Sequence, residues 1–111
     1  MEVFRTDISE KKEFKYVGDT IKQCEYNEQT GLYLYERYLP NGRLLGYEMV
    51  KPVKYKNPDG SIVGSYPSSE QFGRYGWFYS ARSNRDKLIE ALSIVDNRER
   101  NLFIHKEAQQ F

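Results

Sequence analysis

The chain has 111 residues, a length typical of one domain, so a single domain over residues 1–111 is predicted. It contains one cysteine and one histidine, which excludes an intrachain disulfide, a zinc site built from several cysteines or histidines, and a catalytic triad. The net charge of +1 is too small for a protein that binds polyanions over its whole surface.

The amino-terminal residues lack the basic region and apolar stretch of a signal peptide, and no apolar run is long enough to cross a bilayer. A single cysteine is also typical of proteins from a reducing compartment. The sequence therefore predicts a cytoplasmic protein with no membrane partner.

Strands are expected over most of the first 80 residues, where short apolar runs alternate with turn signals. Two runs near the amino terminus, Val3 to Ile8 and Phe14 to Val17, each have the composition of a strand. A third run, Thr20 to Tyr26, is followed by the turn sequence 27–31. Because Gly31 suits the left-handed position of a hairpin loop, this turn is predicted to lead into a strand that begins at Leu32.

The strongest local signal is the turn sequence at residues 40–43. Asn41 and Gly42 both tolerate positive φ, so they are predicted to form the two-residue loop of a type I′ hairpin. In this register the numbers of paired residues sum to 83, which places Tyr38 opposite Leu45. One face of the hairpin is mainly apolar and is expected to meet the core: Leu32, Leu34, Tyr38, Leu45, Tyr47 and Met49.

The other face of this hairpin carries Tyr33, Tyr35, Arg37 and Glu48. Because it mixes aromatic and charged side chains, we expect it to be half-exposed, with Tyr33 and Tyr35 forming an aromatic strip. Tyrosine and arginine are enriched at protein interfaces. These four residues are therefore the predicted partner-binding site.

Two further signals complete the strand region. Pro52 cannot donate to a ladder, so the strand that contains it must bend, bulge or lie at an edge there. Residues 57–60, Asn-Pro-Asp-Gly, have the composition of a type I turn and lead into a strand at residues 61–66. Residues 3–80 are thus predicted to form an antiparallel meander of four to six strands.

The pattern becomes helical after Ser83, which together with Asp86 resembles a capping box. A helix is predicted over residues 84–96, and we expect its apolar stripe to cover the sheet. A possible second short helix at residues 99–109 is favoured by good helix formers, although the apolar run 102–104 leaves a short strand open. The stripe consists of Leu88, Ala91, Leu92 and Val95, widened by Ile89. The predicted fold class is α+β.

No catalytic residue, metal site or cofactor is predicted. The glycines at positions 60, 64, 73 and 76 match neither the dinucleotide fingerprint nor the phosphate-binding loop. His105 is expected at the surface, and Cys24 is expected to be a small buried residue in a strand.

Basic and aromatic residues alternate between positions 51 and 79, in a region where residues 43–85 carry seven basic and three acidic side chains. Single-stranded nucleic acid is bound by cations that meet phosphates and by rings that stack on bases. In the structural interpretation, the lysines simply point outward from a strand and Trp77 belongs to the core. The residues of this alternative site are Lys51, Lys54, Tyr55, Lys56, Arg74, Tyr75 and Trp77.

The sequence therefore predicts a small non-enzymatic binding module, an accessory or regulatory protein that acts on a protein partner through its tyrosine-rich sheet face. The same face could serve self-association into a homodimer. The alternative is a single-stranded nucleic-acid-binding protein. A metal-independent ribonuclease is less favoured. The residues that would stabilise the phosphate charge in such an enzyme are Arg74, Tyr75, Arg82 and Arg85.

Overall fold

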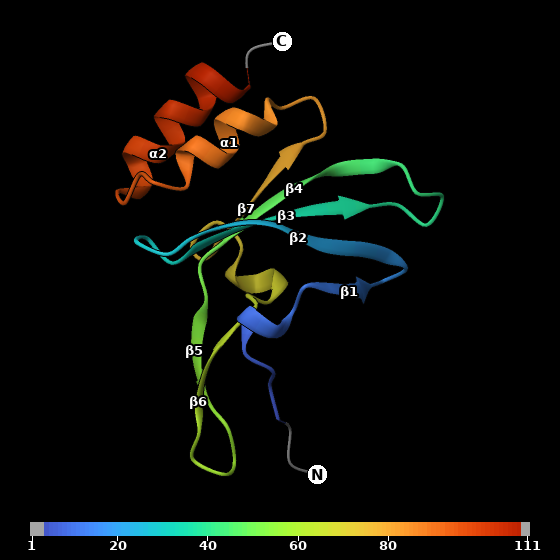
Figure 1. Ribbon diagram of the computed structural model, residues 1–111, viewed down its shortest axis with the longest axis vertical. Coiled ribbons are helices and arrows are strands. Elements are labelled where there is room, and N and C mark those ends of the chain that lie inside the picture. Colours follow the sequence, from blue (N-terminus) through green and yellow to red (C-terminus); the bar gives the residue numbers. More distant parts are fainter. Residues whose placement is uncertain (1–3, 110–111) are drawn as a thin grey trace.

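A five-stranded antiparallel sheet forms the centre of the computed structural model, which describes residues 4–109 (Figure 1). A separate two-stranded hairpin and two carboxy-terminal helices complete the α+β fold that was predicted. The sheet has the order β1 (Glu13–Tyr16), β2 (Asp19–Asn27), β3 (Leu32–Tyr38), β4 (Leu44–Val50) and β7 (Gly76–Ser80). The hairpin consists of β5 (Val53–Lys56) and β6 (Ile62–Ser65). The helices are α1 (Arg85–Ala91) and α2 (Asn97–Phe103), and a π-helical turn (Ile104–Ala108) continues α2.

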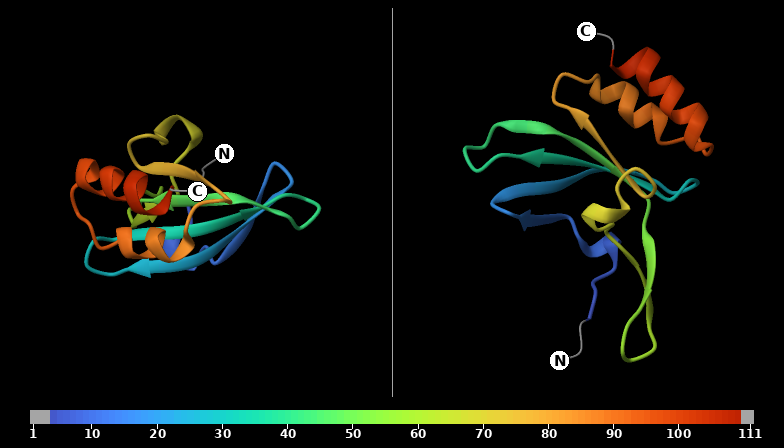
Figure 2. Two further views of the ribbon diagram at one scale, coloured as in Figure 1. Left: turned by 90° about the horizontal axis from the view of Figure 1, so that it is seen from above. Right: turned by 180° about the vertical axis from the view of Figure 1, so that it is seen from behind.

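The two sides of the sheet are covered by different parts of the chain. Figure 2 shows α1 and α2 on one side, which we call the helix face, and the amino-terminal segment with the β5–β6 hairpin on the other, which we call the loop face. No helix within residues 4–109 is long and apolar enough to span a membrane.

The central hairpin has the predicted register over most of its length, with Leu34 opposite Met49. The predicted two-residue loop is wrong, because Gly42 N–H donates to Leu39 C=O at 2.9 Å and Pro40 and Asn41 are therefore the central residues. Proline fixes φ near the value that this turn requires at its first central position, and within the loop only Gly42 adopts positive φ, at 86°.

A β-bulge follows from this longer turn. Tyr38 pairs with Leu44 rather than with Leu45, so the predicted pair is wrong. The bulge also turns Leu45 away from the core, and its side chain is exposed. A second bulge, at Cys24 in β2, lets Ile21 and Tyr26 share the loop face although their numbers differ in parity.

The amino-terminal strand predicted at Val3 to Ile8 does not form within the described residues, which exclude Val3. Residues 8–10 form a 3₁₀ turn instead. The Asp7 carboxylate accepts hydrogen bonds at 3.0 Å from Gly64 N–H and from Ser9 N–H. These bonds lower the pKa of Asp7 and join the 3₁₀ turn to β6. The second predicted strand is confirmed as β1, although Val17 lies in the following turn.

Helix α1 begins one residue later than the capping signal indicated. The side chain of Asn84, not that of Ser83, accepts the cap hydrogen bond from Lys87 N–H at 3.2 Å. The helix also ends at Ala91, five residues before the predicted end. Val95 is consequently exposed, whereas Leu88, Ala91 and Leu92 are buried on the helix face as predicted.

The second carboxy-terminal helix is confirmed. The Asp96 side chain caps it by accepting from Glu99 N–H at 2.9 Å. The turn predicted at residues 57–60 is also confirmed, since Gly60 N–H donates to Asn57 C=O at 2.9 Å. Pro52 lies between β4 and β5, which agrees with its predicted role as an interruption.

Candidate ligand pocket

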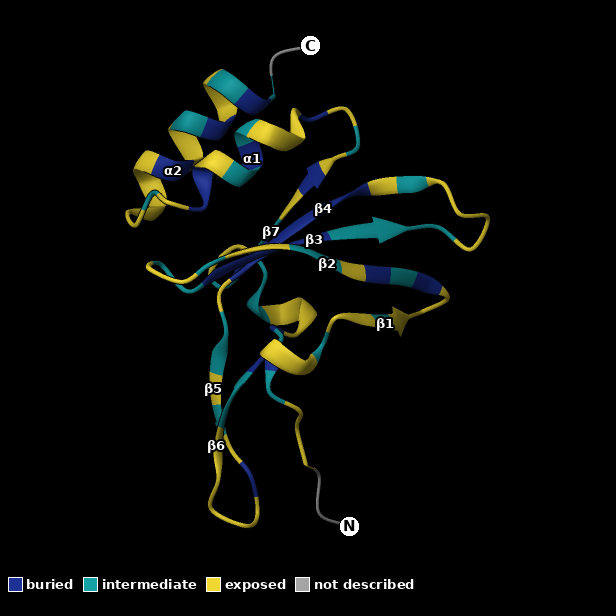
Figure 3. Ribbon diagram, in the orientation of Figure 1, coloured by how far each residue is buried: buried dark blue, intermediate teal, exposed yellow. Residues whose placement is uncertain are grey.

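The loop face is buried at its centre, which contradicts the expectation that it is half-exposed (Figure 3). Tyr33 is 6% exposed, Tyr35 0% and Glu48 3%. The cover comes from distant segments, namely Ile8 of the 3₁₀ turn and Tyr66 of the loop after β6. Tyr33 and Tyr35 are therefore core residues, not an exposed aromatic strip.

A chain of aromatic rings crosses this face. Tyr26 stacks on Tyr33 with ring centroids 4.3 Å apart, and Tyr35 meets Tyr66 edge to face at 5.2 Å. Phe14 of β1 also meets Tyr66 edge to face, at 5.1 Å. The Tyr35 hydroxyl donates to the Lys11 carbonyl at 3.0 Å. Burial raises the pKa of Tyr35 well above its usual value, so its phenol is neutral at physiological pH.

A charged network lies beside these rings. Arg37 donates from Nε to Asp19 Oδ2 at 2.9 Å and from Nη1 to Glu48 Oε2 at 2.8 Å. The Tyr66 hydroxyl donates to the other carboxylate oxygen of Glu48. Burial opposes the charge of Arg37, but the hydrogen bonds to Glu48 and Asp19 outweigh it and raise the pKa of Arg37. Burial, and then the negative charge of Glu48, raise the pKa of Tyr66.

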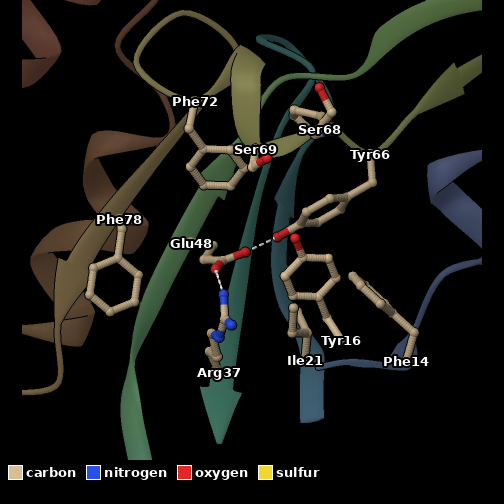
Figure 4. A pocket seen from close by; sticks show the side chains of 11 residues that line it. Phe14, Tyr16, Ile21, Arg37, Glu48, Tyr66, Ser68, Ser69, Phe72 and Phe78 are labelled. Atoms are coloured by element: carbon tan, nitrogen blue, oxygen red, sulfur yellow. Dashed lines mark hydrogen bonds and ion pairs between the residues drawn. The ribbon is translucent and has the colours of Figure 1, made fainter. Parts of the chain in front are cut away.

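An open pocket of about 440 Å³ lies over this network (Figure 4). Phe72 and Phe78 stand on one side of it, and Phe14, Tyr16 and Tyr66 stand on the other. Arg37 and Glu48 lie between the two aromatic walls. The complete lining is Phe14, Tyr16, Ile21, Arg37, Glu48, Tyr66, Pro67, Ser68, Ser69, Phe72 and Phe78.

Gly46 leaves space for the Phe78 ring, which forms the wall of the pocket on its β7 side. It lies in β4 beside β7, and a Cβ atom at this position would come within 2.5 Å of the Phe78 ring. Because glycine has no side chain, the ring can lie against the β4 backbone.

No protein-family model, curated protein or solved structure matches this chain. The chemistry of the pocket therefore carries the functional argument.

Two of the four predicted partner-binding residues, Arg37 and Glu48, line the pocket, whereas Tyr33 and Tyr35 do not. The prediction missed Tyr66 and Phe72, which belong to the segment after β6. A signal was present for Phe72, because Ser68 and Gln71 have the spacing of a capping box and do form one at the 3₁₀ turn 69–71. Phe72 directly follows this turn and lies at the rim of the pocket.

The residues of the predicted nucleic-acid site do not form one surface. Those of the β5–β6 hairpin lie on the loop side, where Arg5 covers the ring of Tyr55 at 4.5 Å. Trp77 lies half-buried on the helix face, with the Arg100 guanidinium 4.9 Å from its ring centroid. The exposed members are Lys51, Lys54, Lys56 and Arg74, and Tyr75 is half-buried. The structural interpretation of the lysines, pointing outward from a strand, is confirmed for β5.

The residues considered for a ribonuclease are also separated. Arg74 and Tyr75 precede β7, whereas Arg82 and Arg85 follow it. A five-residue strand is about 17 Å long, too far for these side chains to meet at one phosphate.

The remaining candidates for chemistry are isolated. His105 is exposed, as predicted. Cys24 is half-buried in β2, and burial raises the pKa of its thiol although Arg85 donates to its sulfur at 3.0 Å. Among residues 4–109, no group of three or more histidine, cysteine or acidic side chains is placed to hold a metal ion.

Proposed function

We propose that the protein is a non-enzymatic binding module that holds an aromatic side chain of a partner protein in the pocket on the loop face. The observation that carries this proposal is the combination of aromatic walls with a floor whose charges already satisfy one another. Pockets of this size and apolar character are typical of ligand sites.

The state of Glu48 argues against catalysis in this pocket. A general base must reach the proton of a substrate with a free oxygen. Both carboxylate oxygens of Glu48 already accept hydrogen bonds, one from Arg37 and one from Tyr66. The carboxylate therefore serves to hold Arg37 and Tyr66 in place.

An aromatic occupant suits the geometry. Phe72, Phe78 and Phe14 offer edges and faces to a ring that enters between them, and such ring pairs are favourable beyond the area that they bury. Within the described residues Arg37 Nη2 makes no hydrogen bond, so it can donate to the hydroxyl of a tyrosine. The exposed Ser68 and Ser69 supply a polar rim.

The test is a titration of the ¹⁵N-labelled protein with N-acetyl-tyrosinamide and, in parallel, with N-acetyl-alaninamide. The tyrosine compound should bind with a Kd on the order of 1 mM, because a ligand of this size contributes about −0.3 kcal/mol per atom. The amide signals that move should belong to residues that line the pocket. The alanine compound should move none of them.

A pair of variants locates the binding. Ser69→Trp places an indole at the pocket mouth and should weaken binding by at least about tenfold, since the ring then competes for the same space. Ser93→Trp, at an exposed position after α1, is the matched control and should bind as the unmodified protein does. Signals that move outside the pocket, or equal binding by the two variants, would refute the proposal.

A further inference from the structure

We infer that the loop-face pocket accepts a tyrosine of the partner and rejects the same residue once it is phosphorylated, so that phosphorylation of the partner ends binding. This inference rests on the proposed function, because it concerns the aromatic side chain that the pocket is proposed to hold. The charges at the pocket floor and the hydrogen bonds of Arg37 support it.

The charged network at the pocket floor carries one net negative charge. Arg37 supplies its single positive charge and contacts two carboxylates, Asp19 Oδ2 at 2.9 Å and Glu48 Oε2 at 2.8 Å. Both acidic residues are buried, so water and salt screen their charges little. Among the described residues that line the pocket, Arg37 and Glu48 are the only charged ones. An entering anion therefore meets an arginine whose charge is already balanced.

The donors of Arg37 suit a phenol better than a phosphate. Arginine holds phosphate through two parallel N–H donors. Two of the three guanidinium nitrogens, Nε and Nη1, already donate to Asp19 and Glu48. Nη2 can meet the single oxygen of a tyrosine hydroxyl. A bidentate contact with phosphate also needs Nε or Nη1, and each of these lies beside a carboxylate that repels the phosphate.

The Tyr66 phenol in the pocket wall shows which charge prevails there. Its hydroxyl donates to Glu48. Burial raises the pKa of Tyr66, the negative charge of Glu48 raises it further, and Arg37 lowers it by a smaller amount. A negatively charged oxygen is thus disfavoured at this wall, and the same charges act on the phosphate of an entering ring.

The aromatic walls add to this discrimination. Phe14, Phe72 and Phe78 have no hydrogen-bond donor in their side chains, and the face of an aromatic ring carries partial negative charge. A phosphate that enters between these rings loses part of its hydration without gaining equivalent bonds, and burial of a charge without such bonds is costly. A neutral phenol ring loses little by comparison.

The experiment compares three blocked ligands by titration of the ¹⁵N-labelled full chain: N-acetyl-tyrosinamide, N-acetyl-O-phosphotyrosinamide and N-acetyl-phenylalaninamide. The phosphorylated compound should bind at least about tenfold more weakly than the tyrosine compound, because like charges then lie close together. The phenylalanine compound should bind about threefold more weakly, since it lacks the hydroxyl that accepts from Arg37 Nη2. Inorganic phosphate should move no signal of a pocket residue.

Three results of this titration would overturn the inference. They are equal or tighter binding of the phosphorylated compound, equal binding of the phenylalanine compound, and shifts of pocket signals with inorganic phosphate. The chain as a whole has a net charge of +1 and does not repel anions from a distance. Weak binding of the phosphorylated compound therefore originates in the pocket.

A matched pair of variants tests the floor charge. Asp19 does not line the pocket, so Asp19→Asn removes one negative charge and keeps the aromatic walls. It should reduce the affinity ratio between the tyrosine and phosphotyrosine compounds by at least about threefold. Glu25→Gln is the control, at an exposed position that pairs with Leu34 on the helix face, and should leave the ratio unchanged. Equal ratios in the two variants would refute the role of the floor charge.

A second variant and the ligand series keep the two proposals separable. If Asp19→Asn does not fold, Glu48→Gln removes the same charge and should change the ratio in the same direction. If the tyrosine and phosphotyrosine compounds bind equally well in the pocket, the proposed function stands and the discrimination fails. If N-acetyl-tyrosinamide moves no pocket signal, both proposals fail.

Discussion

The helix face and the loop face of the sheet are both buried, but the side chains and the covering segments differ. The helix face is largely aliphatic, with Leu32, Leu34 and Met49 packed against Leu88 and Leu92 of the helical segment. The loop face is built from tyrosines and from the charged network around Arg37. Its cover consists of separate pieces of chain from the amino terminus, β1 and the segment after β6.

Because their covers differ, the two faces of the sheet differ in how continuously they are packed. Consecutive turns of helix present a continuous apolar surface that can interdigitate with a sheet at high packing density. Short segments from separate parts of the chain leave gaps where they meet, and the loop-face pocket lies at such a junction between Phe14, Tyr66 and Phe72. The helix face is therefore the more continuously packed of the two, and the loop face contains the pocket on which the proposed function rests.

The largest effect is expected for Leu34→Ala on the helix face. Leu34 is completely buried among the residues of β4 and the helices, so its truncation should leave a cavity and cost about 3 kcal/mol of unfolding free energy. Urea unfolding measures the loss. Leu45→Ala removes the same atoms from an exposed position and should change stability by less than about 0.5 kcal/mol. Similar losses for the two variants would contradict the difference in packing.

A smaller effect is expected for Glu48→Gln on the loop face. The substitution removes the negative charge beside Arg37, which is four-fifths buried, while Asp19 remains as its second partner. We therefore expect a cost of about 2 kcal/mol, below that of breaking a fully buried pair. Glu25→Gln, at an exposed position of β2, is the control and should be neutral. A loss no larger than that of the control would show that the network does not stabilise this face.

The local features of the sheet could be predicted from the sequence, because they depend on neighbouring residues. The left-handed glycine at position 31 and the turn at residues 57–60 follow from turn chemistry. The register of β3 with β4 agrees with the prediction although the predicted loop is wrong, because the bulge at Leu45 offsets the change of turn. The error at Leu45 has the same local origin, because Pro40 selects a longer turn and the bulge follows.

The burial of the loop face could not be predicted in this way. Alternation indicates that Tyr33 and Tyr35 share a face but not which distant segment covers it. The covering residues Ile8 and Tyr66 are far from β3 in the sequence, and neither has a local signal that directs it there. The helix end at Ala91 is a similar case, since no proline or glycine marks it. At this end of the helix, the Ser93 hydroxyl donates a hydrogen bond to the Glu90 carbonyl at 2.8 Å.

One tyrosine on each face, Tyr79 buried on the helix face and Tyr66 half-buried on the loop face, makes the comparison testable at alkaline pH. Burial raises the pKa of Tyr79 on the helix face to about 12 and also raises the pKa of Tyr66 on the loop face. An unfolded tyrosine ionises near pH 10, so the stability that these phenols contribute is complete below pH 10 and decreases as the pH rises toward the folded pKa. Each protected tyrosine should therefore cost about 1.4 kcal/mol of stability at pH 11.

Phenylalanine substitutions at these two positions should respond to pH in different ways. Tyr79→Phe should be neutral at pH 7, because the Tyr79 hydroxyl has no hydrogen-bond partner within residues 4–109, and more stable than the unmodified protein by about 1 kcal/mol at pH 11. Tyr66→Phe should cost about 1 kcal/mol at pH 7, because its hydroxyl donates to Glu48, and should recover that loss at pH 11. Urea unfolding at the two pH values measures both differences. A loss of stability for Tyr79→Phe at pH 7 equal to that for Tyr66→Phe would show that both hydroxyls are hydrogen-bonded, and the contrast between an apolar helix face and a polar loop face would fail at these positions.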